Sequence, residues 1–164
     1  MLKSVKSRRI MTTTLAVAFA LTIGGSVFAA EAAGKVRYEA EAGKIKGTDT
    51  KIVAHAAASA GKKVGWINIP DKDSVTFTVN VPTAGDYIIE VTYDAGAGDA
   101  KQTMLVNGKE KFTVRLPRTG SWEEIDVAEG VKVHLKAGAN TVALIAASSF
   151  AEIDCIDISP ATAE

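Results

Sequence analysis

The sequence predicts an all-β protein whose strands form a β-sandwich. Beyond Lys35, apolar residues alternate with polar residues at a period of two, which is the pattern of strands that bury one face. No apolar stripe with helical spacing accompanies this alternation. The alternating runs also recur at short intervals, separated by turn-forming residues, and this spacing is typical of sandwiches.

The first 30 residues have the features of a secretory signal peptide. Four basic residues lie within the first nine, an apolar run extends from about Met11 to Phe28, and Ala29 and Ala30 begin a small-residue cleavage region. Thr12 to Thr14 and Gly24-Gly25 interrupt the apolar run, so a retained membrane helix is the weaker interpretation. We therefore expect a secreted, extracellular protein with one domain over residues 35–160 and no membrane contact after cleavage.

The charge of the mature region argues against nucleic acid as the main partner. All 19 acidic residues follow residue 30, whereas four of the 19 basic residues precede it, which leaves 15 basic against 19 acidic residues and a net charge of −4. The lone cysteine, Cys155, cannot form an internal disulfide. Stability must then come from the core, and from a metal if one is bound.

The strongest strand signals follow one another along the chain. Each run carries apolar residues on one parity, and turns such as Pro82–Asp86, Asn107-Gly108 and Ala137–Asn140 separate them. The predicted strands lie at Val75–Val81, Tyr87–Tyr93, Met104–Val106, Phe112–Leu116, Val131–Leu135, Thr141–Ala146 and Cys155–Ile158.

Three acidic residues near the two ends of the domain form a candidate metal site. Glu39 and Glu41 are two residues apart, and on a strand this spacing points both carboxylates to one face. Asp154 shares parity with the apolar residues of the last strand. If the first and last strands meet, the three acids could hold one calcium ion, because a hard cation uses several carboxylates. The alternative is a solvated acidic strand end.

Two tryptophans are predicted to face away from the core. Ile67 and Ile69 share one parity, which places Trp66 with Asn68 on the polar face. Similarly, assigning Ile125 and Val127 to the core leaves Trp122 on the polar face. Exposed indoles beside polar groups suit a sugar, whose rings have apolar C–H faces and whose hydroxyls need hydrogen-bond partners. The alternative is that one or both pack under a loop, and a bulge would reverse either parity.

These residues belong to a set of segments, in a fixed order from Tyr38 to about Ile158, that resembles carbohydrate-binding module families 6 and 35. Each segment alone is a weak signal, and it is their order that makes the resemblance specific. The segments are YEAEAG (38–43), ASAGKKVGWI (58–67), VTFTVNVPTAGDYIIEVTY (75–93), VNG (106–108), LPRTGSW (116–122), VHLKAGANTVAL (133–144) and EIDCIDI (152–158).

The resemblance implies a galactose-binding-like jelly roll with a structural calcium and a glycan site at the loop end. It places Glu39, Glu41 and Asp154 at the metal positions, with backbone carbonyls from Ser59–Lys62 completing the shell. It also matches Trp66 and Trp122 to the aromatic pair of the family, while nearby polar side chains select the sugar.

This chain departs from the family pattern at three positions. Glu152 stands where the family usually has an asparagine that bonds a sugar hydroxyl, and an ionised glutamate only accepts hydrogen bonds. Either the ligand differs or the site has weakened, so Glu152 remains a candidate ligand-binding residue. Cys155 and Ile125 replace usual aromatics, and both exchanges are interpreted as core packing.

No set of residues predicts catalysis. Glu123 and Glu124 are adjacent and would point to opposite faces, whereas a glycosidase needs two facing carboxylates. Cys155 with His55 or His134 has no accompanying oxyanion loop. We expect a non-catalytic module that binds a poly- or oligosaccharide, alone or beside a separately secreted glycoside hydrolase. The alternative is a structural or adhesive jelly roll that has lost its sugar and acts through protein contacts.

Overall fold

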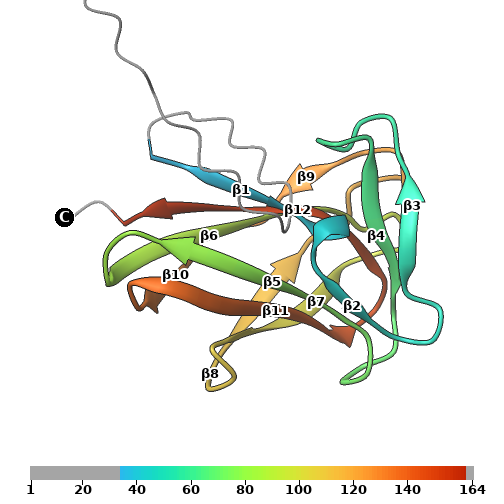
Figure 1. Cartoon of the computed structure of the whole chain (residues 1–164). Helices are drawn as coiled ribbons and strands as arrows, with labels where there is room; N and C mark the ends of the chain where they lie inside the picture. The colour runs from blue at the N-terminus through green and yellow to red at the C-terminus, as the bar shows by residue number, and fades with distance from the viewer. Residues whose placement is uncertain (1–33, 162–164) are drawn as a thin grey trace, which may run out of the picture.

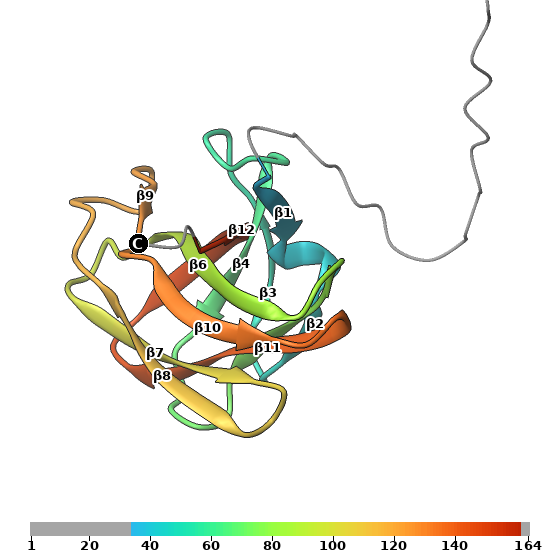
Figure 2. The same cartoon turned by 90° about the vertical axis from the view of Figure 1, so that its left-hand side faces the viewer.

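The computed structural model describes residues 34–161, which form two β-sheets packed face to face (Figures 1 and 2). The predicted all-β sandwich is therefore confirmed. Within the described residues, the one helical element is a single 3-10 turn, η1 (Ala40–Ala42). The predicted signal peptide lies outside the described residues. Within residues 34–161, no helix is long and apolar enough to cross a membrane.

The larger sheet has seven strands, with the main order β10-β6-β12-β4-β3; β1 pairs with β12, and β9 pairs with β6. All of these pairs are antiparallel. The strands are β1 (Val36–Glu39), β3 (Lys51–Ala54), β4 (Lys62–Ile67), β6 (Gly85–Asp94), β9 (Asp126–Val127), β10 (Val131–Leu135) and β12 (Ala151–Pro160).

The smaller sheet has the order β2-β5-β11-β7-β8 and is also antiparallel. The β7–β8 hairpin turns at Asn107 and Gly108, which both have positive φ, as the sequence predicts for an Asn-Gly hairpin. The strands are β2 (Lys44–Lys46), β5 (Ser74–Val81), β7 (Ala100–Val106), β8 (Glu110–Leu116) and β11 (Gly138–Ser148).

The core between the two sheets consists of the apolar side chains that alternate along each predicted strand. The residues with the largest fully buried side chains include Tyr93, Phe77, Ile89, Met104 and Leu144. Burying one such side chain stabilises the fold by about 1.5–3 kcal/mol. Period-two patterning therefore determines which face of each strand packs inward.

The first and last strands meet as predicted. Val36 pairs with Ile158, and Glu39 pairs with Cys155, which brings the two ends of the domain together. The expected geometry of the acid pair is wrong, however. β1 ends at Glu39 and Glu41 lies in η1, so the two carboxylates do not share one face of a strand.

Two other expectations about strand parity are corrected. The segment from Trp122 to Ile125 is a loop, and Val127 in β9 is exposed rather than in the core. β4 ends at Ile67, so Asn68 lies beyond the strand rather than on the same strand face as Trp66. Local sequence could not reveal these differences, because where a strand starts and ends depends on the strands that pair with it.

Candidate functional site

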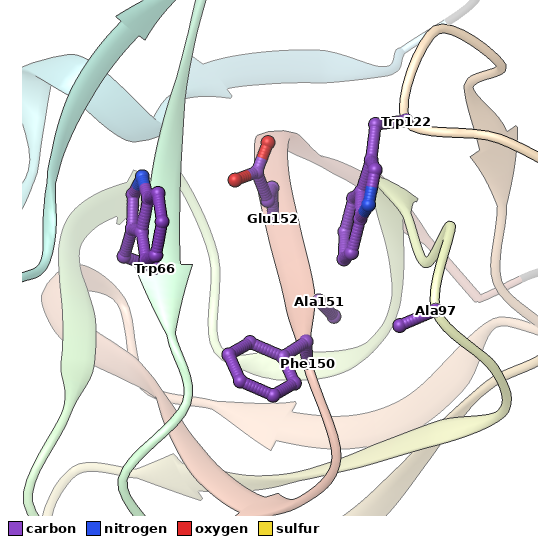
Figure 3. Close-up of a pocket in the computed structure, with 6 residues that line it drawn as sticks. All are labelled: Trp66, Ala97, Trp122, Phe150, Ala151 and Glu152. Carbon is purple, nitrogen blue, oxygen red and sulfur yellow. The ribbon is translucent and has the colours of Figure 1, made fainter.

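An open cavity of about 390 Å³ lies where the ends of β4 and β6 meet the start of β12. This volume is within the range of small-molecule sites in proteins. Figure 3 shows the indoles of Trp66 and Trp122 on opposite sides of the cavity, with Glu152 between them and Phe150 at one end. The lining residues are Trp66, Ala97, Trp122, Phe150, Ala151 and Glu152.

A β-bulge turns Trp66 toward the cavity. Ile153 pairs with Val64 and Ala151 pairs with Ile67, so Glu152 alone stands opposite both Gly65 and Trp66. Trp66 has φ 64°, a conformation that bulky residues rarely adopt. The bulge leaves its indole 47% exposed.

Gly65 makes room for the side chain of Glu152. A Cβ at Gly65 would lie 2.6 Å from Oε1 of Glu152, closer than van der Waals contact allows. The other carboxylate oxygen, Oε2, lies 2.8 Å from Nζ of Lys63. The missing side chain at Gly65 therefore lets the Glu152 carboxylate lie over β4, where it lines the cavity.

Trp122 is held against the chain by two close approaches. A Cβ at Gly96 would lie 2.7 Å from both the backbone nitrogen and a ring carbon of Trp122, so only glycine fits beneath this residue. The Trp122 carbonyl accepts hydrogen bonds from Nζ of Lys63 at 3.1 Å and from Nε2 of His55 at 3.0 Å. Although Trp122 lies in a loop, these contacts fix its backbone.

Lys63 connects both sides of the site. Its side chain is 4% exposed, and its ammonium pairs with Asp94 and Glu152 as well as with the Trp122 carbonyl. One buried cation therefore positions both the acceptor and one of the tryptophans of the cavity.

His55 and Asp94 complete this buried network. Because a carbonyl only accepts, Nε2 of His55 carries the proton that bonds Trp122, while Nδ1 is buried without a partner. Burial raises the pKa of Asp94 to about 6 despite its ion pair with Lys63. The site thus rests on charged groups that solvent barely reaches.

Glu39 and Asp154 meet at a second cluster of oxygen atoms. The Ser59 hydroxyl lies 2.6 Å from Oε2 of Glu39 and 3.0 Å from Oδ1 of Asp154, and the Ser59 N–H donates to both Asp154 oxygens at 3.1 Å. Burial raises the pKa of Glu39, and the charges of Asp154 and Glu41 raise it further. The carboxylates are close enough to repel one another when ionised.

The donors of this cluster fit a hard cation. Glu41, the third predicted ligand, is not in the group whose ligand atoms lie within 4.8 Å of one another, although its Oε2 is buried without a hydrogen-bond partner. Cys155 Sγ also lies within 4.8 Å of the Glu39 and Asp154 oxygens, but burial raises the pKa of this thiol to about 12. A protonated thiol is a poor ligand, which leaves an all-oxygen donor set suited to calcium.

The structure brings together most of the residues singled out from the sequence, but not all of them. Trp66, Trp122 and Glu152 line one cavity, whereas Asn68 does not; its N–H donates to Asp73 instead. Trp122 is 37% exposed because it lies in a loop and not because of strand parity.

Sequence reasoning missed Phe150, Lys63 and His55. Phe150 is a single aromatic residue beside the turn between β11 and β12. Its position near a loop is the one sequence feature that could have indicated a role in the site. Lys63 is on a strand next to the exposed Lys62, and no local feature distinguishes the buried lysine from its neighbour.

An open, aromatic-walled cavity at the loop end of a β-sandwich is the kind of site that can stack on sugar rings. The sequence matches the model of carbohydrate binding module family 35 over residues 36–161. The chain therefore belongs to carbohydrate-binding module family 35, a family of non-catalytic binding modules.

Two relatives found by sequence are enzymes that contain a similar segment. The chain is 35% identical over 108 residues to an isomaltosyltransferase of Sporosarcina globispora, covering 66% of this chain and 10% of that protein. It is 30% identical over 129 residues to mannan endo-1,4-beta-mannosidase B of a Piromyces species, covering 79% of this chain and 22% of that protein. The chain thus spans less than a quarter of the length of these relatives.

Solved structures show the same fold. A family 35 carbohydrate binding module from Clostridium thermocellum superimposes with a TM-score of 0.69 at 29% identity, covering 75% of this chain and 97% of that one. A Listeria monocytogenes protein, solved with α-D-glucose, β-D-glucose, magnesium and calcium, also has a TM-score of 0.69, at 30% identity, covering 76% of this chain and 12% of that protein.

Proposed function

We propose that this chain is a secreted, non-catalytic module that binds a poly- or oligosaccharide in the cavity between Trp66 and Trp122. The observation that carries the proposal is the placement of the two indoles on either side of Glu152 in a family 35 fold. Aromatic faces stack on pyranose rings, and the carboxylate accepts hydrogen bonds from sugar hydroxyls.

The charge of the cavity favours a neutral sugar. Glu152 and Asp94 carry two negative charges against the single positive charge of Lys63. A uronate at this position would meet a net negative charge in a partly desolvated site, whereas hydroxyl groups would donate to Glu152. Mannans and α-glucans are the first glycans to test, because the named relatives are a mannosidase and an isomaltosyltransferase.

A calcium ion bound by Glu39, Glu41 and Asp154 would stabilise the fold in this proposal. The buried, unpartnered oxygen of Glu41 supports it, as does the repulsion between carboxylates that a cation would relieve. The solved Listeria monocytogenes relative also contains calcium. Calcium at 100 times its dissociation constant would stabilise the folded state by about 2.7 kcal/mol.

Affinity electrophoresis through gels that contain soluble glucomannan or dextran tests the binding site. Trp122→Ala and Trp66→Ala should each weaken retardation by about 30-fold, the effect of losing a central aromatic anchor. The control is Val127→Ala, which shortens an exposed apolar side chain that does not line the cavity. Thermal melting with and without chelator tests the calcium site on the same samples.

The outcomes separate the two halves of the proposal. If the folded wild type is not retarded by any of a broad panel of neutral glycans, the glycan proposal is wrong, and a structural or adhesive role through protein contacts replaces it. If the melting temperature is the same with and without chelator, calcium does not stabilise the fold. If both tryptophan variants bind like wild type, the sugar lies elsewhere on the domain.

A further inference from the structure

The outward face of the five-stranded sheet carries basic side chains and no acidic ones. On each strand the residues between the core positions point away from the other sheet, and the acidic Glu110 of β8 is on the inward parity. The exposed basic residues on this face are Lys44 and Lys46 of β2, Lys101 of β7, and Lys111 and Arg115 of β8.

This charge contrasts with the rest of the domain. Residues 34–161 contain 17 acidic and 15 basic residues, yet none of the acids stands at an outward position of these five strands. None of the five cations forms an ion pair with another described residue. Arg37 and Lys63, which lie elsewhere in the domain, are both paired. The five charges are therefore free to meet an anionic partner.

The strand register places four of the five cations on the two edge strands of this sheet, β2 and β8, and Lys101 on β7 beside β8. Lys44 pairs with Thr76, Thr76 with Ala143, Ala143 with Leu105, and Leu105 with Lys111, so one row crosses all five strands. Figures 1 and 2 show β2 and β8 at opposite edges of this sheet. Four strand spacings separate the ends of the row by about 19 Å, a length that suits a chain with several charged units.

Between the cations, the face carries the partly buried apolar residues Leu105, Ala143 and Ile145, and it also carries small hydroxyl and amide side chains. These include Thr78 and Asn80 of β5, Thr141 of β11, Thr103 of β7 and Thr113 of β8. They can donate hydrogen bonds to hydroxyls and accept hydrogen bonds from them. The face thus offers both parts of a site for a charged and hydroxylated polymer.

Other occupants fit this face less well. None of the exposed large apolar residues of the described chain lies on it, so it lacks the anchors by which surfaces insert into membranes or stack on bases. Lysine is also depleted in protein interfaces. An anionic polysaccharide therefore fits this face best, because its charges can pair with the cations and its hydroxyls can bond the polar side chains.

We propose that the outward face of the five-stranded sheet is a second glycan-binding surface, which binds an anionic, carboxylate-bearing polysaccharide through Lys44, Lys111 and Arg115. This surface is separate from the cavity between the tryptophans, where Glu152 disfavours acidic sugars. The domain would then hold two chemically different glycans at once.

The test is affinity electrophoresis of the domain through polygalacturonate at low ionic strength, with fully methyl-esterified polygalacturonate as the uncharged probe. The triple variant Lys44→Gln, Lys111→Gln, Arg115→Gln should weaken retardation about ten-fold, because three exposed ion pairs are lost. The matched control replaces Lys62, Lys72 and Lys136 by glutamine. These lysines are also exposed, so the net charge is the same.

The expected result is that wild type, the control and Trp122→Ala are retarded by the polygalacturonate, that the ester retards none of them, and that added salt weakens the binding. Equal losses in the triple variant and the control would overturn the proposal, since net charge alone would explain them. Loss in Trp122→Ala would assign the uronate to the cavity instead.

Three further arms exclude the other occupants. Tighter binding of a single-stranded oligonucleotide or of phosphatidylserine vesicles, lost in the triple variant, would overturn the polysaccharide assignment. Dimerisation of wild type that the triple variant abolishes would make the face an interface between copies. Binding of neutral glycans at the tryptophans is measured in separate gels. A negative result for one site therefore does not affect the interpretation of the result for the other.

Discussion

Replacing Lys63 by methionine tests the buried network beneath the sugar cavity. The substitution keeps the length of the side chain but removes the cation that pairs with Asp94 and Glu152 and bonds the Trp122 carbonyl. Asp94 is 1% exposed and already has one carboxylate oxygen without a partner. The variant therefore leaves a buried carboxylate with no compensating charge.

The expected cost is large. Removing one partner of a buried ion pair destabilises a protein by about 3–5 kcal/mol, because the other charge stays desolvated. The lost bond to the Trp122 carbonyl adds to this cost and loosens one side of the cavity. By comparison, Lys62→Met changes an exposed lysine of the same strand and should shift stability by no more than about 0.5 kcal/mol.

The loss should also depend on pH. Burial raises the pKa of Asp94 to about 6, above its value in the unfolded chain, so stability falls as pH rises through about 6. Without Lys63 this pKa rises further, and each unit of that rise costs about 1.4 kcal/mol at higher pH. The Lys63→Met deficit should therefore be smaller at about pH 5 than at about pH 8.

Urea unfolding of wild type, Lys63→Met and Lys62→Met at these two pH values measures the effect. The double variant Lys63→Met, Asp94→Asn removes both charges and should recover much of the loss at about pH 8, since an uncharged amide needs no counterion. A Lys63→Met deficit that does not change with pH, or that merely equals that of Lys62→Met, would refute the reasoning.

Two further predictions concern the positions of the tryptophans. Gly96→Ala would force Trp122 away from its present backbone position and should weaken glycan binding about ten-fold by titration calorimetry; Gly85→Ala, which meets no atom within 4 Å, should bind like wild type. Lys51→Gln removes an ammonium 5.2 Å from the centre of the Trp66 ring and should change affinity by less than about five-fold, because an exposed cation–π contact is worth about 0.5–1 kcal/mol. A larger change would mean that Lys51 touches the sugar.

The sequence determined the strands and the face that each one buries. The alternation of Val75–Val81 places every second residue in the core, because a strand has only two faces and the chain must bury its apolar one. The Asn107-Gly108 turn likewise fixed the β7–β8 hairpin, since few residue pairs tolerate two positive φ angles. These features depend on residues that are close to one another in the chain, so they can be predicted from the sequence.

Only the tertiary structure decided how the site is built. Trp66 faces the cavity through a bulge opposite Glu152, and a bulge depends on pairing between strands far apart in the sequence. Lys63 and Lys62 are adjacent lysines, yet one is buried because Asp94 and the Trp122 carbonyl converge on it from other elements. The energy of a buried charge depends on the groups that surround it in space, and a single sequence does not show which groups these are.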